Sequence, residues 1–209
     1  MKKVGVGIAL GISLMMIAGC SSKKVLMPPK IDLHEFQKIG LVEFTSNAEG
    51  DLHELASQKF IQTMQSAQPG VPVLELGDKK HVLKTIERSA LDYDAIQAIG
   101  KMYNVDAVII GNLEVTDVKP HVNMTQMLTS MAIQADVEAA LTTRLMETES
   151  GATMWTRSAR WKQTVAHAGI DSRGGFEFDA SDPEGAYGKL VDNLVYHVTR
   201  DFRSYWVKQ

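Results

Sequence analysis

A long stretch of alternating polar and apolar residues constrains the fold of this chain more than any other feature. From 133 to 145 apolar or small side chains occupy every second position, with Gln134, Asp136, Glu138 and Arg144 between them. A period of two is typical of a β-strand with one buried face. A second alternating stretch covers 155–165, and the turn residues 149–151 separate the two. Together they predict an antiparallel hairpin of two long strands.

Three further strands are expected before this hairpin. Residues 38–44 predict the first and 71–76 the second. The nearly continuous apolar run 105–111 predicts a third strand, buried on both faces, which continues by alternation through Val118 and stops at Pro120. Pro72 has no N–H to donate, so the second strand is expected at a sheet edge or to begin at that residue.

Four helices are expected between and after these strands. Apolar spacing predicts one over 52–67, a short one after Gly77 or Asp78, and one that begins at Asp92 or Asp94 and stops at Asn104. In this third helix the side chains expected to face inwards are Ile96, Ile99 and Met102. Residues 166–180 contain three glycines and are interpreted as a loop.

The last helix has the clearest boundaries. Ser181 or Asp182 is expected to cap it and Pro183 to lie in its first turn. Its apolar stripe runs from Tyr187 to Phe202, and Tyr205 and Trp206 are expected to extend it. The order is thus strand, helix, strand, helix, helix, three strands, helix. This order predicts an α/β (α+β) fold with helices packed on a mixed β-sheet.

The N-terminal residues predict a bacterial lipoprotein signal. Lys2 and Lys3 precede an apolar run of about 14 residues, which is too short to cross a bilayer, and Ala18 and Gly19 then precede Cys20. Cys20 is the only cysteine, and its acylation is expected to anchor the chain. We therefore expect a signal peptide over 1–19, a lipidated tether over 20–35 and one globular domain over 36–209. The alternative is an ordinary signal peptide with a chance cysteine.

The charge of the chain disfavours nucleic-acid binding. Removing Lys2 and Lys3 with the signal peptide lowers the formal net charge from −3 to about −5, and a polybasic surface is not expected. The residue after the cysteine is Ser21, and a serine at this position resembles the pattern of lipoproteins that are sorted to the outer membrane of a Gram-negative cell. The expected location is therefore the periplasmic face of the outer membrane. With Cys20 acylated, no disulfide is expected.

No residue pattern predicts an enzyme, a cofactor site or a metal site. The six histidines show no two-histidine motif at helical metal-ligand spacing, and no motif of an activated serine nucleophile occurs after the signal. A zinc site assembled from scattered ligands is the alternative to having no metal site.

Three segments are candidates for partner contacts. The first holds Met124, Met127 and Met131, whose flexible side chains suit an adaptable surface or a membrane-facing lip, or else cover their own core. The second is the glycine-rich segment with Arg173 and Phe176, either a contact or a mobile loop. The third is Trp206, which suits the lipid headgroup level or packing on a helix face.

Three blocks carry a family resemblance: residues 38–44, 98–111, and Thr148 with Gly151 and Trp155. They resemble the lipoprotein superfamily that contains the curli-secretion protein CsgG, the polysaccharide-export protein PelC and the penicillin-binding-protein activator LpoB. The resemblance covers residues 36 to 206 and implies a fold like the amino-terminal domain of TolB, with no catalytic residues. PelC-like proteins keep a compact domain close to the membrane and assemble as a ring.

These observations predict a non-enzymatic lipoprotein that acts as an assembly or accessory component of an envelope export or secretion machine. Its expected partners are the lipid bilayer, through acylated Cys20, and either further copies of the chain or an envelope protein. The alternatives are an LpoB-like regulator of peptidoglycan synthases and an envelope hydrolase with a scattered site. The short tether makes the regulator geometrically awkward, because about 13 residues reach at most roughly 45 Å.

Overall fold

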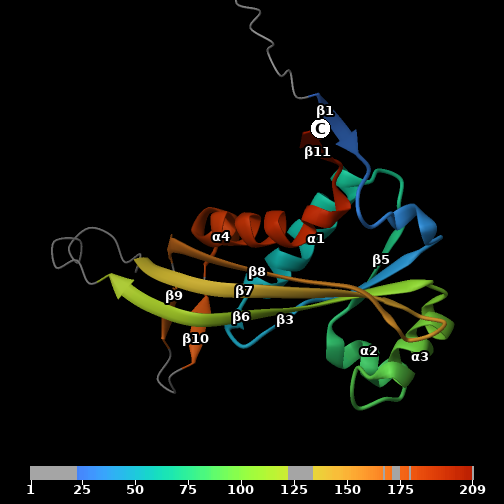
Figure 1. Ribbon diagram of the computed structural model, residues 1–209. Coiled ribbons are helices and arrows are strands. Elements are labelled where there is room, and N and C mark those ends of the chain that lie inside the picture. The colour runs from blue at the N-terminus through green and yellow to red at the C-terminus, as the bar shows by residue number, and fades with distance from the viewer. Residues whose placement is uncertain (1–22, 122–133, 167, 171–174, 179, 209) are drawn as a thin grey trace, which may run out of the picture.

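A mixed six-stranded sheet organises the fold, and helices cover both of its faces (Figure 1). The computed structural model describes residues 23–121, 134–166, 168–170, 175–178 and 180–208. The strands lie in the order β5-β2-β6-β7-β8, and the short β3 pairs beside β6. Their bounds are Ile39–Val42 for β2, Thr45–Ser46 for β3, Val73–Gly77 for β5, Ala107–His121 for β6, Gln134–Glu147 for β7 and Thr153–Ala166 for β8.

The parallel half of the sheet is built from two crossovers on opposite faces. β2 pairs in parallel with both β5 and β6. Helix α1, Leu52–Ala67, connects β2 to β5, whereas α2, Lys79–Thr85, and α3, Tyr93–Tyr103, connect β5 to β6. Figure 1 shows α1 on one side of the sheet with α4, Pro183–Val198, and α2 and α3 on the other. The predicted α+β class and the order of these nine elements are confirmed.

Two separate hydrophobic clusters follow from this layering. The larger joins the sheet to α1 and α4 and includes Phe44, Phe60 and Tyr187. The smaller joins the other face to α2 and α3. Lys59 on α1 links the two large helices, because its Nζ lies 2.7 Å from Glu184 and 3.3 Å from Asp192 on α4.

Side-chain caps define the starts of α2, α3 and α4, as the sequence predicts, whereas Asp51 precedes α1 without forming a side-chain cap. Asp78 accepts hydrogen bonds from the backbone N–H groups of Lys80 and His81, and Asp92 accepts one from Ala95. Asp182, rather than Ser181, caps α4. Asn104 ends α3 in the left-handed conformation, also as predicted. The prediction that Met102 faces inwards is wrong, because its side chain is 56% exposed near the end of α3, on the side away from the core.

The three long strands β6, β7 and β8 form an antiparallel meander that extends past the helices (Figure 1). β7 alternates between buried and partly exposed residues over most of its length, as its period of two predicts. Strand β6 runs one residue past the predicted stop at Pro120, because Pro120 pairs with Ala135 and the strand ends at His121.

The interpretation of 166–180 as a loop is wrong for two short stretches. β9, Ala168–Ile170, pairs antiparallel with β10, Phe176–Phe178, and β10 pairs in parallel with β4, Glu49–Gly50. Phe178 is fully buried in the larger cluster and meets Tyr187 edge-on. This small sheet therefore closes one end of that cluster.

The two ends of the domain also differ from expectation. Helix α4 does not continue through Tyr205 and Trp206: it passes into a 3₁₀ turn, Thr199–Phe202, and then into strand β11, Tyr205–Lys208. β11 pairs antiparallel with β1, Lys24–Met27, which belongs to the expected tether. A second 3₁₀ turn, Leu33–Glu35, buries Leu33 completely. Much of 20–35 is therefore part of the fold.

Candidate functional site

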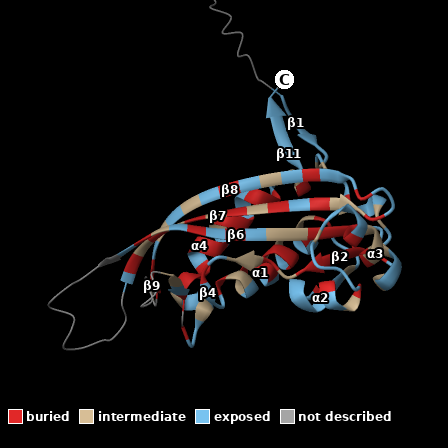
Figure 2. Ribbon diagram, turned by 90° about the horizontal axis from the view of Figure 1, so that it is seen from below, coloured by how far each residue is buried: buried red, intermediate tan, exposed pale blue. Residues whose placement is uncertain are grey.

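The two-stranded ribbon β1–β11 projects from the domain and is covered by no other described element (Figure 2). Seven of its eight residues are exposed, and Val25 is partly exposed. Five of the ten large hydrophobic side chains exposed in the described part of the chain lie here: Leu26, Met27, Tyr205, Trp206 and Val207. Trp206 is the most exposed of the ten, at 64%. The ribbon is thus the main apolar surface that the described part of the chain leaves in water.

The register gives the ribbon two different faces. Lys24 lies opposite Lys208, and Leu26 lies opposite Trp206. Residues two apart in a strand share a face, so these four side chains form one surface, which we call the basic aromatic face. Val25, Met27, Tyr205 and Val207 form the other surface. A shallow hollow between Lys24, Trp206 and Lys208 marks the basic aromatic face.

Asp201 fixes the base of the ribbon to the sheet. Its backbone carbonyl accepts hydrogen bonds from the N–H groups of Lys30 at 2.9 Å and Ile31 at 3.2 Å. Its carboxylate accepts hydrogen bonds from Trp155 Nε1 and from the Arg157 guanidinium, both on β8. The segment after β1 is therefore tied to the turn before β11 and to the central sheet.

These contacts also set the ionisation of Asp201. Burial by itself raises the pKa of its carboxyl. The hydrogen bonds from Trp155 and Arg157, and the charges of Arg157 and Lys30, outweigh that effect, so the pKa lies below its ordinary value. The base of the ribbon thus holds a partly buried carboxylate that stays ionised at neutral pH.

A second polar contact holds the same base from the side of α1. Gln68, at the end of α1, accepts a hydrogen bond from the Leu33 N–H at 2.7 Å. Its amide donates to the carbonyl oxygens of Ile31 at 2.7 Å and Phe202 at 3.0 Å. One buried side chain therefore joins the segments that leave β1 and enter β11.

A groove of about 440 Å³ lies elsewhere, at the carboxyl ends of the parallel strands. The crossover from β2 to β5 and the crossover from β5 to β6 run on opposite faces of the sheet. The sheet therefore has a topological switch point between β2 and β6, where open α/β sheets usually bind ligands. The groove is lined by Val42, Glu43, Thr45, Lys79, Leu91, Ile110, Gly111, Asn112, Thr142 and Arg144. The sequence analysis missed this groove, although the polar residues that follow the first predicted strand are a usable signal.

Three charged side chains line the groove: Glu43, Lys79 and Arg144. Glu43 is paired with His53 Nε2 at 3.3 Å, while Lys79 and Arg144 have no ion pair among the described residues. Within the ranges that the structure describes, no group of three or more His, Cys, Asp or Glu side chains is placed to hold a metal ion. The geometry suits hydrogen bonding to a small polar molecule.

The structure separates the candidate contact residues. Trp206 lies on the ribbon, whereas Phe176 lies on β10, partly buried against the larger cluster. The predictions for Cys20, Met124, Met127, Met131 and Arg173 lie outside the described residues. The alternative that Trp206 packs on a helix face is wrong, because Trp206 lies on strand β11 and its side chain is exposed.

No described helix has the length and apolar character needed to span a membrane. No protein-family model and no curated protein sequence matches the chain. Among solved structures, it is similar to the PelC dodecamer from Paraburkholderia phytofirmans, with 13% identity, a TM-score of 0.48, and coverage of 87% of this chain and 97% of that one. It is also similar to lipoprotein GNA1162 from Neisseria meningitidis, with 16% identity, a TM-score of 0.39, and coverage of 61% and 83%. It is similar as well to the LpoB C-terminal domain from Salmonella enterica, with 10% identity, a TM-score of 0.36, and coverage of 66% of this chain and 86% of that one.

Proposed function

We propose that this chain is a non-enzymatic lipoprotein of the outer membrane. Acylated Cys20 holds the domain at the periplasmic face, where it serves as an assembly or accessory component of an export or secretion machine. The observation that carries the proposal is the position of β1. Lys24 already belongs to the fold and stands only four residues after the cysteine of the signal motif.

The short connection determines where such a domain works. Four residues span at most about 14 Å, against roughly 45 Å for the tether expected from the sequence. A domain held this closely contacts partners at the membrane surface. It does not reach across the periplasm, which favours an assembly component over a regulator that reaches distant synthases.

Open sheet edges support an oligomeric form of this component. β8 pairs with β7 on one side and with no described strand on the other, and β5 is the opposite edge. Strand β8 carries Arg160 and Lys162, which also pair with Glu138 and Asp136 of β7 at 3.5 and 3.6 Å, while β5 carries the exposed Glu75. A contact between two different edges is head-to-tail, the type of contact that closes rings.

The anchoring part of the proposal is tested with globomycin and labelled palmitate. We expect palmitate to label the wild-type chain, globomycin to cause the precursor to accumulate, and Cys20→Ala to abolish labelling and release the protein by osmotic shock. A precursor that is processed normally in globomycin, with no label on the mature chain, would refute lipid anchoring.

The assembly part is tested by native mass spectrometry on the lipidated protein extracted in detergent. We expect one discrete ring. The charge reversal Glu75→Lys, at an exposed glutamate of β5 with no ion pair among the described residues, should dissociate it, whereas Lys189→Glu, at an exposed lysine on α4, should not. A strict monomer that copurifies with a peptidoglycan synthase would instead support the regulator.

A further inference from the structure

We propose that the basic aromatic face of the β1–β11 ribbon rests on the lipid headgroups of the membrane that holds Cys20, and so fixes the orientation of the domain. This inference rests on the proposed lipid anchor. It adds a second, non-covalent contact with the same bilayer, made by the C-terminal residues of the chain.

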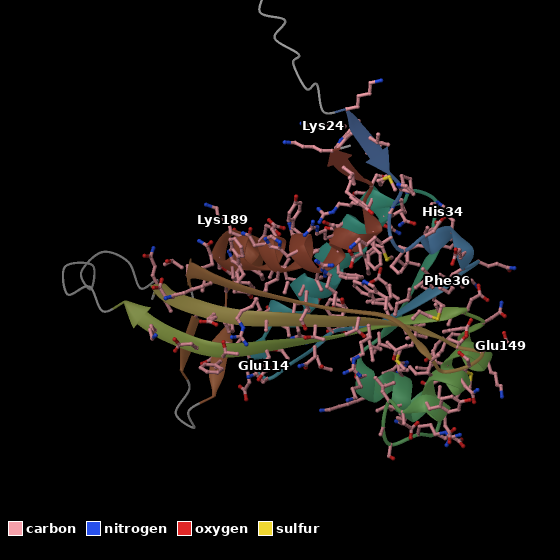
Figure 3. The ribbon with its side chains drawn as sticks, in the orientation of Figure 1. Lys24, His34, Phe36, Glu114, Glu149 and Lys189 are labelled. Atoms are coloured by element: carbon pink, nitrogen blue, oxygen red, sulfur yellow. The ribbon has the colours of Figure 1, made fainter. Side chains whose placement is uncertain are left out.

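The first argument is distance. Lys24, at the tip of the ribbon, is separated from Cys20 by only three residues, so the tip lies within about 14 Å of the acylated cysteine. Figure 3 shows the Lys24 side chain at the outer end of the ribbon, directed away from the domain. Because the register places Lys208 beside Lys24, β11 is brought equally close.

The second argument is chemistry. Tryptophan combines a large apolar ring with an N–H donor and is enriched at the level of lipid headgroups. Trp206 stands beside Leu26 on one face of the ribbon, and the two lysines of that face lie at the tip. Lysines beside an apolar contact are attracted by anionic lipids and extend their amino groups to the headgroups.

The third argument is the local charge. Residues 21–31 contain Lys23, Lys24 and Lys30 and no acidic residue, and residues 203–209 contain Arg203 and Lys208 and no acidic residue. The chain as a whole has a formal net charge of −3. The ribbon is therefore a basic end on an acidic protein, which turns this end towards an anionic surface.

The fourth argument is the contrast between the ribbon and its base. An isolated two-stranded ribbon is marginally stable in water, and this one has neither a third strand nor a covering helix among the described elements. Its base, however, is fixed by the hydrogen bonds of Asp201 and Gln68. An uncovered apolar ribbon on a fixed base suits a surface that becomes covered when the protein is in place.

The test uses the lipidated full-length mature protein in vesicles of phosphatidylethanolamine with a minority of phosphatidylglycerol. Some of the lipids carry bromine near the headgroup as a fluorescence quencher. The chain has three tryptophans, so the difference between wild type and Trp206→Phe isolates the signal of Trp206. Trp161→Phe is the matched control, because Trp161 is partly exposed but lies on β8, stacked on His197.

We expect the protein to float with the vesicles, and the emission of Trp206 to shift to shorter wavelength and to lose intensity to the brominated lipids. Trp161→Phe should retain this quenching and Trp206→Phe should lose it. A protein that floats while Trp206 stays unquenched would overturn the inference, leave lipid anchoring intact and indicate a protein partner for the ribbon. A protein that does not float would overturn both.

Discussion

The side-chain amide of Gln68 donates a hydrogen bond to the carbonyl oxygen of Phe202 at 3.0 Å, although 134 residues separate the two in the chain. Gln68 is 4% exposed and is one of the few buried polar side chains among the described residues. With its contacts to Ile31 and Leu33, it ties the segment after β1 to the segment before β11. The ribbon can therefore keep a fixed direction without a covering layer of its own.

The first prediction concerns this glutamine. Gln68→Ala leaves the buried Leu33 N–H without its acceptor and two carbonyl oxygens without a donor. We expect the free energy of unfolding to fall by about 2–4 kcal/mol, since an unsatisfied buried group costs about 1–3 kcal/mol. Urea denaturation measures this change. Gln58→Ala, at an exposed glutamine of α1, is the control and should cost less than about 0.5 kcal/mol. Equal effects of the two substitutions would refute the buried role.

The second prediction concerns pH. The pKa of Asp201 is lower in the folded protein than its ordinary value of about 3.9, so its contribution to stability is fully present above that value. This contribution is lost as the pH falls from about 4 through the folded pKa. Asp201→Asn should be less stable than wild type at pH 7 and should lose less stability on acidification. Thermal unfolding from pH 7 to pH 2 checks this, and parallel profiles for the two proteins would contradict it.

The third prediction concerns packing beside the groove. A Cβ added at Gly111 would lie 2.4 Å from the ring of Phe44, which is 1% exposed. Gly111→Ala should therefore cost about 1–3 kcal/mol. Phe44→Leu removes part of the obstructing ring, so the double variant should be more stable than the sum of the single effects by about 1 kcal/mol. A denaturation cycle over the four proteins measures this coupling, and strict additivity would show that the two residues do not meet.

The fourth prediction concerns the ribbon ladder. Successive N–H groups of an edge strand point to opposite sides, so Trp206→Pro combined with Val207→Pro removes one hydrogen bond to β1. We expect trypsin to cleave after Lys24 about tenfold faster, because local opening exposes the chain. The midpoint of thermal unfolding should remain close to that of wild type.

Trp206→Ser is the control for this experiment. It removes the same exposed indole but keeps the backbone N–H, and should therefore leave the cleavage rate at Lys24 close to the wild-type rate. Equal rates for wild type and the double proline variant would mean that the β1–β11 pairing does not protect the chain.

Local signals in the sequence predicted the central fold. Each of these signals depends on residues that are close together in the chain. They are the alternation of β7, the caps at Asp78 and Asp92, and the helix stop at Asn104. The sequence does not reveal the groove at the switch point between β2 and β6, because locating this groove requires knowing which face of the sheet each crossover helix covers. That information is in the packing of α1 and α2, not in either segment alone.

The errors fall where distant segments pair. β9 and β10 are three residues each, too short for any periodicity, and exist because β10 pairs with β4, well over 100 residues earlier. Tyr205 and Trp206 continue the helical stripe of α4 in sequence, but their strand forms against Met27 and Leu26. The sequence therefore indicates Trp206 as a contact candidate from its chemistry but predicts the wrong local structure for it.

The antiparallel register of the ribbon also matters for anyone who engineers this protein. Because Lys24 lies opposite Lys208, both ends of the fold leave it side by side. An affinity tag or fluorescent fusion placed after Gln209 would emerge close to Cys20, the proposed site of lipidation, and would compete for the same space. An epitope inserted at the turn that contains Glu149, well away from the ribbon in Figure 3, would leave that end of the molecule clear.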